Sequence, residues 1–218
     1  MTTTPRLAGL GPEQFEVFSI QEFQPCMDAL LACVRPRLEQ LGAALRDRMS
    51  ERLGESLHLH VARHARRTVN PPRDTWLALS PEARSYKAHP HFQLGLWGTH
   101  VFAQFALIYE SPIRPAVAGR LLERLDAGAG HLAPDLRWSG DHTLPGGVSQ
   151  TDPEGVRQLL VRARDLRKAE VLCGRDLDRD DARVQDGEAL LNWTLETWID
   201  TLPLWAVARS LEFSRPGR

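Results

Sequence analysis

Two stretches of alternating side chains, residues 91–97 and 100–107, flank the dipeptide Gly98-Thr99. A two-residue connection with glycine first is typical of a type II′ turn, so these stretches predict an antiparallel hairpin. In this hairpin Trp97 pairs with His100, and the rest of the register follows from that pair. Because side chains alternate along a strand, the register determines which residues share a face.

The predicted register separates the side chains of the hairpin by their chemistry. One face is apolar and is expected to form the core: Phe92, Leu94, Leu96, Val101, Ala103, Phe105 and Leu107. The opposite face carries His91, Gln93 and Gln104, which we expect to form the floor of a polar pocket with Trp97 as a stacking wall. Sheet faces of this kind can also bind single-stranded nucleic acid. A register shift of one residue would exchange the two faces.

Other periodic stretches indicate the remaining sheet and the helices. Residues 57–62 alternate, with His58 and His60 on one side, and residues 75–79 have a strand-like composition. Between them and the hairpin lies Lys87, which the extended register places roughly opposite Glu110. Phe15, Val17 and Ile20 alternate as in a short edge strand.

Apolar positions three and four residues apart predict amphipathic helices at 23–53 and 188–209. The first is expected to kink or to divide into two helices at Arg35-Pro36, and the second to kink at Pro203. Residues 127–152, rich in glycine and proline, predict a long irregular connection. We therefore predict an α+β fold, with a mainly antiparallel sheet and helices packed on one face.

Length and composition fit one soluble domain. The 218 residues are 42% hydrophobic and 25% charged, which favours a single folded domain over 13–212 after a flexible tail at 1–12. The net charge of −1 gives no general attraction to nucleic acid or membrane. Three cysteines without a paired spacing, and an N-terminus without an apolar leader, indicate a cytoplasmic protein that does not enter a membrane.

A basic loop is the strongest candidate for ligand binding. Arg63, Arg66 and Arg67 precede Asn70, and two prolines follow. Guanidinium groups on a stiff turn suit phosphate or carboxylate, because each donates two parallel hydrogen bonds. Alternatively, these arginines pair with the acidic stretch 176–200 of the same chain.

The clustered histidines give a second, weaker candidate. His58, His60 and His64 could begin a metal shell, with Asp141 and His142 as distant donors. The alternative is that these imidazoles bond to neighbours or water. Because no cysteine pair or carboxylate has a matching spacing, we assign no metal site, and the cofactor stays unassigned. No Walker loop, GxGxxG, GxSxG, HExxH or zinc-ribbon spacing occurs.

Several stretches form recognisable motifs: 60–72, 74–76, Tyr86-Lys87, 90–97 and 108–110, and more weakly 35–38, Trp138-Ser139 with Asp141-His142, and 168–174. Together these motifs resemble the YktB family of uncharacterised bacterial proteins. This resemblance implies a single-domain α+β protein and supplies no reaction.

The leading hypothesis is a cytosolic binder of an anionic, phosphate-bearing ligand such as a nucleotide or nucleic acid. The expected ligand-binding residues are Arg63, His64, Arg66, Arg67, Asn70, Lys87, His91, Gln93 and Gln104, with His60 among those that orient the ligand. One alternative is a hydrolase or transferase with His60 or His91 as general base, since histidine titrates near neutral pH. Another is a protein-interaction module without a small ligand.

Overall fold

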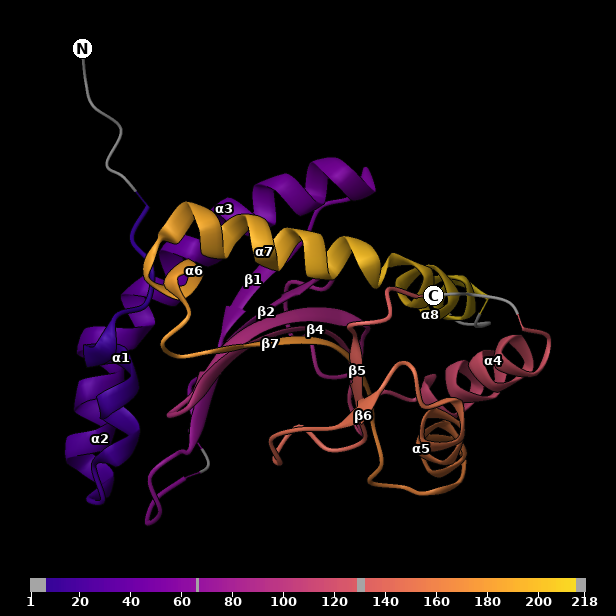
Figure 1. The fold of residues 1–218 in the computed structure, drawn as a ribbon, viewed down its shortest axis with the longest axis horizontal. Coiled ribbons are helices and arrows are strands. Elements are labelled where there is room, and N and C mark those ends of the chain that lie inside the picture. Colours follow the sequence, from indigo (N-terminus) through magenta and orange to yellow (C-terminus); the bar gives the residue numbers. More distant parts are fainter. Residues whose placement is uncertain (1–6, 66, 129–131, 215–218) are drawn as a thin grey trace. The chain divides into compact units, whose positions relative to one another are not determined.

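The computed structural model describes residues 7–65, 67–128 and 132–214. Its strands are β1 (His58–Val61), β2 (Asp74–Ser80), β3 (His91–Trp97), β4 (His100–Leu107), β5 (Arg137–Ser139), β6 (Val148–Ser149) and β7 (Val171–Asp178). They form one seven-stranded sheet in the order β1-β2-β3-β4-β7-β5-β6, and the pairs β1–β2, β5–β6 and β5–β7 are antiparallel (Figure 1). The predicted α+β fold with a mainly antiparallel sheet is confirmed.

Helices account for most of the remaining chain. They are α1 (Pro12–Glu16), α2 (Phe23–Ala29), α3 (Arg35–Leu53), α4 (Arg114–Asp126), α5 (Pro153–Asp165), α6 (Ala182–Gln185), α7 (Gly187–Asp200) and α8 (Leu202–Phe213), with a 3-10 turn η1 (Val17–Ser19) and a π turn η2 (Leu30–Val34). Among the described residues, none of these helices combines the length and apolar character needed to cross a bilayer.

The chain divides into two compact units. The first comprises Met1–Ala83, Gln93–Ala103 and Asp176–Glu196, and the second comprises Arg84–Phe92, Gln104–Arg175 and Thr197–Arg218. Each unit is described by itself below.

In the first unit α3 packs against β1 and β2 (Figure 1). The close approach depends on Gly42, because a Cβ atom there would lie 2.5 Å from a methyl carbon of Leu59 and 3.2 Å from one of Leu77. Leu77 is fully buried. Helix α3 therefore covers the side of β1 and β2 that carries Leu59 and Leu77.

The predicted break at Arg35-Pro36 is present as a π turn. Residues 30–34 form η2, and Pro36 then occupies the first turn of α3. Proline has no N–H to donate to the preceding turn, so a wider turn before it keeps the chain helical. Helix α3 ends at Gly54, which has a left-handed φ of 66°.

The edge strand predicted around Phe15 is wrong. Phe15 lies in α1 and Val17 in η1, and both are buried. Pro12 starts the helix, and the side chain of Gln14 accepts a hydrogen bond from the Gly11 N–H at 2.7 Å. The helix-starting residues at 11–14 therefore determine the local structure, and the alternation of apolar residues over 15–20 is too short to form a strand.

The start of the chain before α1 also belongs to the packed structure. Leu10 is fully buried, and its N–H donates to the Val184 carbonyl at 2.8 Å. Residues 1–6 of the tail expected at 1–12 lie outside the described residues.

The hairpin has the predicted two-residue connection, since β3 ends at Trp97 and its neighbour β4 begins at His100. The rings of Trp97 and His100 stack with centroids 6.2 Å apart. The expected type II′ turn is wrong, because neither Gly98 nor Thr99 has a positive φ. Contacts from outside the hairpin hold the turn: Arg179 donates from its guanidinium to the Gly98 carbonyl at 3.1 Å and from its backbone N–H to the Thr99 carbonyl at 3.0 Å.

The aliphatic face of the hairpin is buried as predicted. Phe92, in the second unit, stacks on Trp205 of α8 with centroids 4.6 Å apart and also contacts Trp198 of α7 at 5.4 Å.

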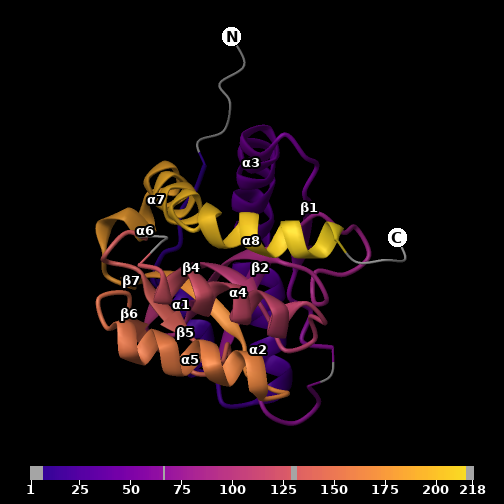
Figure 2. The same ribbon diagram turned by 90° about the vertical axis from the view of Figure 1, so that its right-hand side faces the viewer.

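The last helix is interrupted at Thr201, two residues before Pro203, so the predicted 188–209 helix is two helices. In the same unit α4 packs against both α5 and α8 (Figure 2).

The polar side of the hairpin, expected to form the floor of a pocket, is buried. His91, Gln93 and Gln104 are all at most 3% exposed. In the second unit, Tyr86 packs edge-on against the His91 ring with centroids 4.7 Å apart, and His91 Nδ1 bonds to the His89 carbonyl at 2.9 Å. In the second unit, the loop before β3 therefore covers His91 through Tyr86.

The long connection 127–152 is not fully irregular. It contains β5 and β6, which pair through Trp138 and Val148, and β5 also pairs with β7 through Trp138 and Cys173. Short strands of two or three residues give too little periodicity to be recognised in sequence.

Replacing Gly42 should test the packing of α3 on the sheet. In Gly42→Val the added atoms collide with Leu59 and Leu77, so the free energy of unfolding should fall by about 1–3 kcal/mol in urea denaturation. Gly119→Val in α4 is the matched control, because the nearest atom to its Cβ position is 4.0 Å away. Its stability should change by less than about 0.5 kcal/mol, and an equal loss in both variants would contradict the packing argument.

His64 should make the protein less stable in acid. Burial and the nearby charge of Arg67 lower the pKa of His64 to about 4 from its ordinary value of 6.5. The unfolded chain therefore binds a proton that the folded protein does not, and stability falls as the pH falls from 6.5 toward 4. At pH 5 the loss should be about 1–2 kcal/mol.

Urea denaturation at pH 7 and pH 5 measures this loss. His64→Asn should reduce it, since asparagine tolerates the positive φ of 49° found there. His58→Asn, at an exposed position of β1, should behave as wild type. Identical pH dependence in His64→Asn and wild type would show that His64 is not the group responsible.

Candidate functional site

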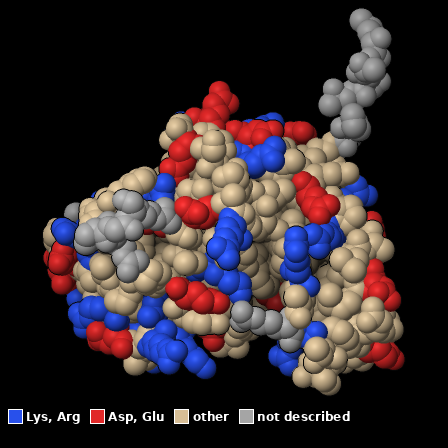
Figure 3. Space-filling view, turned by 180° about the vertical axis from the view of Figure 1, so that it is seen from behind, with Lys and Arg blue, Asp and Glu red and all other residues tan. Residues whose placement is uncertain are grey.

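The basic loop lies between β1 and β2 in the first unit. Arg63, Arg67 and Asn70 are exposed, and Arg66 lies outside the described residues. His64 instead turns inward: its Nε2 bonds to Thr75 Oγ1 at 3.1 Å, and its ring packs edge-on against Trp76. The loop therefore offers guanidinium groups to solvent, while His64 supports its backbone. Figure 3 shows one face of the molecule, on which Lys and Arg side chains are interspersed with Asp and Glu.

The histidines of β1 do not join His64 in a metal shell. His58 is exposed, and His60 Nε2 bonds to the Glu82 carbonyl at 2.9 Å. Burial lowers the pKa of His60, although this bond acts in the opposite direction. Within the described residues, the group of possible metal donors that comes together is Asp141, His142 and Glu170.

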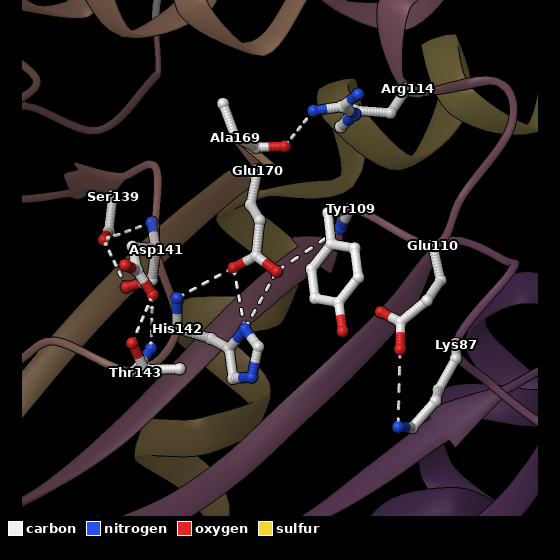
Figure 4. A network of polar contacts seen from close by, with 10 residues as sticks. All are labelled: Lys87, Tyr109, Glu110, Arg114, Ser139, Asp141, His142, Thr143, Ala169 and Glu170. Atoms are coloured by element: carbon white, nitrogen blue, oxygen red, sulfur yellow. Dashed lines mark hydrogen bonds and ion pairs between the residues drawn. The ribbon is translucent and has the colours of Figure 1, made fainter. Parts of the chain in front are cut away.

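This group belongs to the second unit and joins two segments, and Tyr109 of a third segment lies beside it (Figure 4). Asp141 and His142 follow β5, Glu170 immediately precedes β7, and Tyr109 follows β4. Because β5 and β7 are paired, with Ser139 opposite Leu172, the loop after β5 lies beside the start of β7. The Glu170 N–H donates to the Gly140 carbonyl at 3.0 Å and fixes this arrangement.

Glu170 is the centre of the group. Its side chain is 1% exposed, and its oxygens accept hydrogen bonds from the His142 N–H at 2.8 Å and the Tyr109 N–H at 3.3 Å. His142 Nδ1 lies 2.8 Å from both carboxylate oxygens. The imidazole is 23% exposed, so a buried carboxylate orients a ring that reaches solvent.

Arg114 supports the backbone that carries Glu170. Its guanidinium is buried and donates to the carbonyls of Leu166, at 2.8 Å, and Ala169. Burial lowers the pKa of Arg114, and the charge of Glu170 opposes that shift. The residue thus fixes the segment that enters β7.

Asp141 is held by its own turn. Its Oδ1 accepts hydrogen bonds from the N–H and the hydroxyl of Thr143 at 2.8 and 2.6 Å. Burial acts to raise the pKa of Asp141, but these bonds and the charge of His142 outweigh it, and the pKa is lowered. The bonds stabilise the turn that presents His142 to Glu170.

Beside this group, Lys87 and Glu110 form the ion pair predicted from the register, with Nζ 3.4 Å from Oε1. The other oxygen of Glu110, Oε2, is buried and has no hydrogen-bond partner among the described residues. In Figure 4 the Tyr109 ring lies between His142 and Glu110, and Tyr109 is exposed. Imidazole, phenol, ammonium and an unsatisfied carboxylate oxygen are thus grouped together.

The same residues include a donor set that suits a divalent cation. One ligand atom from each of Asp141, His142 and Glu170 lies within 4.8 Å of the others. Carboxylate and imidazole are common ligands of such ions. However, the hydrogen bonds described above already account for the positions of all three side chains.

The sequence identified this site only in part. Lys87 was predicted as a ligand-binding residue and Asp141 and His142 as distant metal donors, whereas Glu170 and Tyr109 were not selected. The sequence did contain an indication of Tyr109 and Glu170, because both lie in stretches that carry the family resemblance, 108–110 and 168–174. Nothing in their spacing showed that these stretches meet in the fold.

Comparison with known proteins gives the family of the chain. Residues 11–205 match the model described as a domain of unknown function, DUF1054. A UPF0637 protein of Oceanobacillus iheyensis is 37% identical over 200 residues, covering 92% of this chain and 96% of the relative.

Two further UPF0637 proteins are similar over most of their length. The one from Lysinibacillus sphaericus is 40% identical over 197 residues, covering 89% of this chain and 93% of the relative. The one from Bacillus velezensis is 44% identical over 172 residues, covering 78% and 81%. These matches confirm the resemblance inferred from the motifs, and the chain belongs to the DUF1054 family of bacterial UPF0637 proteins.

Proposed function

We propose that the second unit carries the active site of a hydrolase or transferase in which His142 is the general base and Glu170 positions it. The observation that carries this proposal is the contact between His142 Nδ1 and both oxygens of the buried Glu170, at 2.8 Å. A carboxylate at Nδ1 fixes the tautomer of an imidazole and makes its Nε2 the basic nitrogen. This pair replaces His60 and His91, whose rings bond to backbone carbonyls.

The chemistry of the proposed base is proton transfer from an oxygen nucleophile. His142 Nε2 takes the proton of a water or hydroxyl group while the oxygen attacks a phosphorus or carbonyl carbon. The same imidazolium returns the proton to the leaving group as its bond breaks. Glu170 stabilises the positive charge on the ring during the step, as a buried carboxylate does in other histidine-dependent enzymes.

The neighbouring residues favour an anionic substrate that also donates hydrogen bonds. Lys87 supplies a positive charge beside the site, and its ion pair with Glu110 is weak enough, when partly exposed, to rearrange around an anion. The buried Oε2 of Glu110 needs a donor, which a substrate hydroxyl or amine would provide. The ring of Tyr109 gives a flat wall. A phosphate-bearing small molecule with a sugar or amine fits these features.

Replacing His142 tests the proposal in a screen of phosphate and carboxylate esters. His142→Gln should reduce kcat/KM by about 100-fold or more, since general bases contribute roughly that factor. The wild-type rate should rise with pH as the imidazole loses its proton, and this limb should disappear in the variant. His58→Gln, at an exposed site on β1, is the matched control and should retain full activity.

Two results would contradict this assignment. One is an ester hydrolysed by wild type and by His142→Gln at the same rate. The other is a rate that depends on His58 as strongly as on His142. Circular dichroism of each variant shows whether a loss of rate reflects unfolding.

A second function is favoured by the basic loop, which we propose binds phosphate groups of a nucleotide or nucleic acid. Arg63 and Arg67 are exposed, and no carboxylate of the described residues pairs with either of them. The acidic stretch 176–200 pairs with other arginines, since Glu188 contacts Arg48 and Asp200 contacts Arg175. The intramolecular partner considered from the sequence is therefore not formed by these residues.

Salt dependence tests the proposed phosphate binding. Binding of a fluorescent oligonucleotide should weaken as salt increases, because each phosphate contact releases counterions. In Arg63→Gln with Arg67→Gln the affinity should fall by about tenfold or more at low salt, with a shallower salt dependence. Arg46→Gln, an exposed arginine paired with Asp47 on α3, is the control. Equal affinity in the double variant and the control would exclude the loop as the site.

A further inference from the structure

A recess in the second unit lies among α4, α5, α8 and β5, and Gln150, the residue after β6, also lines it. Its walls are mainly aliphatic and include Leu121 and Leu125 of α4, Leu160 of α5 and Leu204 of α8. Figure 2 shows the helices that form it, with α4 between α5 and α8. The recess has a volume of about 50 Å³ and is partly open to solvent.

The polar side chains of this recess include two donor groups without an acceptor among the described residues. Arg124 lines it, and no carboxylate of the described residues pairs with its guanidinium, whereas Arg120 on the same helix pairs with Glu123 at 3.4 Å. Gln150 also lines it, and its Oε1 accepts from the indole N–H of Trp138 at 2.6 Å. An indole N–H can only donate, so this bond identifies the amide oxygen and leaves the amide NH₂ as a donor without an acceptor among the described residues.

We infer that this recess binds an aliphatic carboxylate. A guanidinium and an amide NH₂ together suit the two oxygens of a carboxylate, because both groups donate. The aliphatic walls suit a hydrocarbon tail, since burial of apolar surface stabilises the complex. No Asp or Glu is among the lining residues, so an amine would find no partner there. This site is separate from the proposed active site and does not depend on His142.

Titration with sodium octanoate, followed by calorimetry and by the indole N–H resonance of Trp138, tests the inference. Octanoate should bind saturably at one site and shift that resonance, which Trp138→Phe assigns. Octylammonium should bind at least about tenfold more weakly, because its positive charge is repelled by the guanidinium of Arg124. Leu125→Trp, which fills the recess from a partly exposed position, should abolish binding.

Arg124→Gln is the decisive variant. It should fold normally, because Arg124 is partly exposed and forms no ion pair with the described residues. It should weaken octanoate binding by about tenfold or more, and Arg120→Gln should leave it unchanged. His142→Gln should also bind octanoate normally, which separates this site from the proposed active site. Three results would overturn the inference: no saturable binding of octanoate, equal affinity for octylammonium, or wild-type affinity in Arg124→Gln.

Discussion

Burial of the Glu170 carboxylate is the interaction on which the arrangement of the second unit's loops depends. A carboxylate removed from water is costly unless hydrogen bonds replace its hydration. Here the replacements are backbone N–H groups of His142 and Tyr109 and the imidazole of His142. They come from two parts of the chain, around Tyr109 and around His142, so the cost of burying the carboxylate is offset only when both segments meet the start of β7.

The same interaction connects the fold to the proposed chemistry. Strands β5 and β7 form the rigid support, and the functional groups lie on the loops at their ends, a common arrangement in enzymes. Arg114 fixes the segment before Glu170, and the turn around Asp141 fixes the segment that carries His142. The imidazole is thus oriented from its buried side and reaches solvent at its other edge. An orientation held by buried contacts needs no ordering when a substrate binds.

Features set by neighbours in sequence were predictable, and those set by distant residues were not. The two-residue connection of the hairpin, its buried apolar face and the irregular helix before Pro36 follow from local patterns, and the structure confirms them. The prediction of a type II′ turn was wrong. Arg179, which is 80 or 81 residues away along the chain, donates hydrogen bonds to the carbonyls of Gly98 and Thr99 and holds the turn in another conformation. The burial of His91 was not predictable from the pattern of β3, because Tyr86 of the preceding loop packs on its ring. Glu170 was missed because its partners His142 and Tyr109 are 28 and 61 residues distant.

The most direct measurement of the central claim is the tautomer of His142 by ¹⁵N NMR of the imidazole ring at neutral pH. If Glu170 orients the ring, Nδ1 carries the proton and Nε2 is unprotonated, and Glu170→Gln changes this distribution. A ring protonated at Nε2, or one that averages between the two tautomers as a solvated histidine does, would contradict the account.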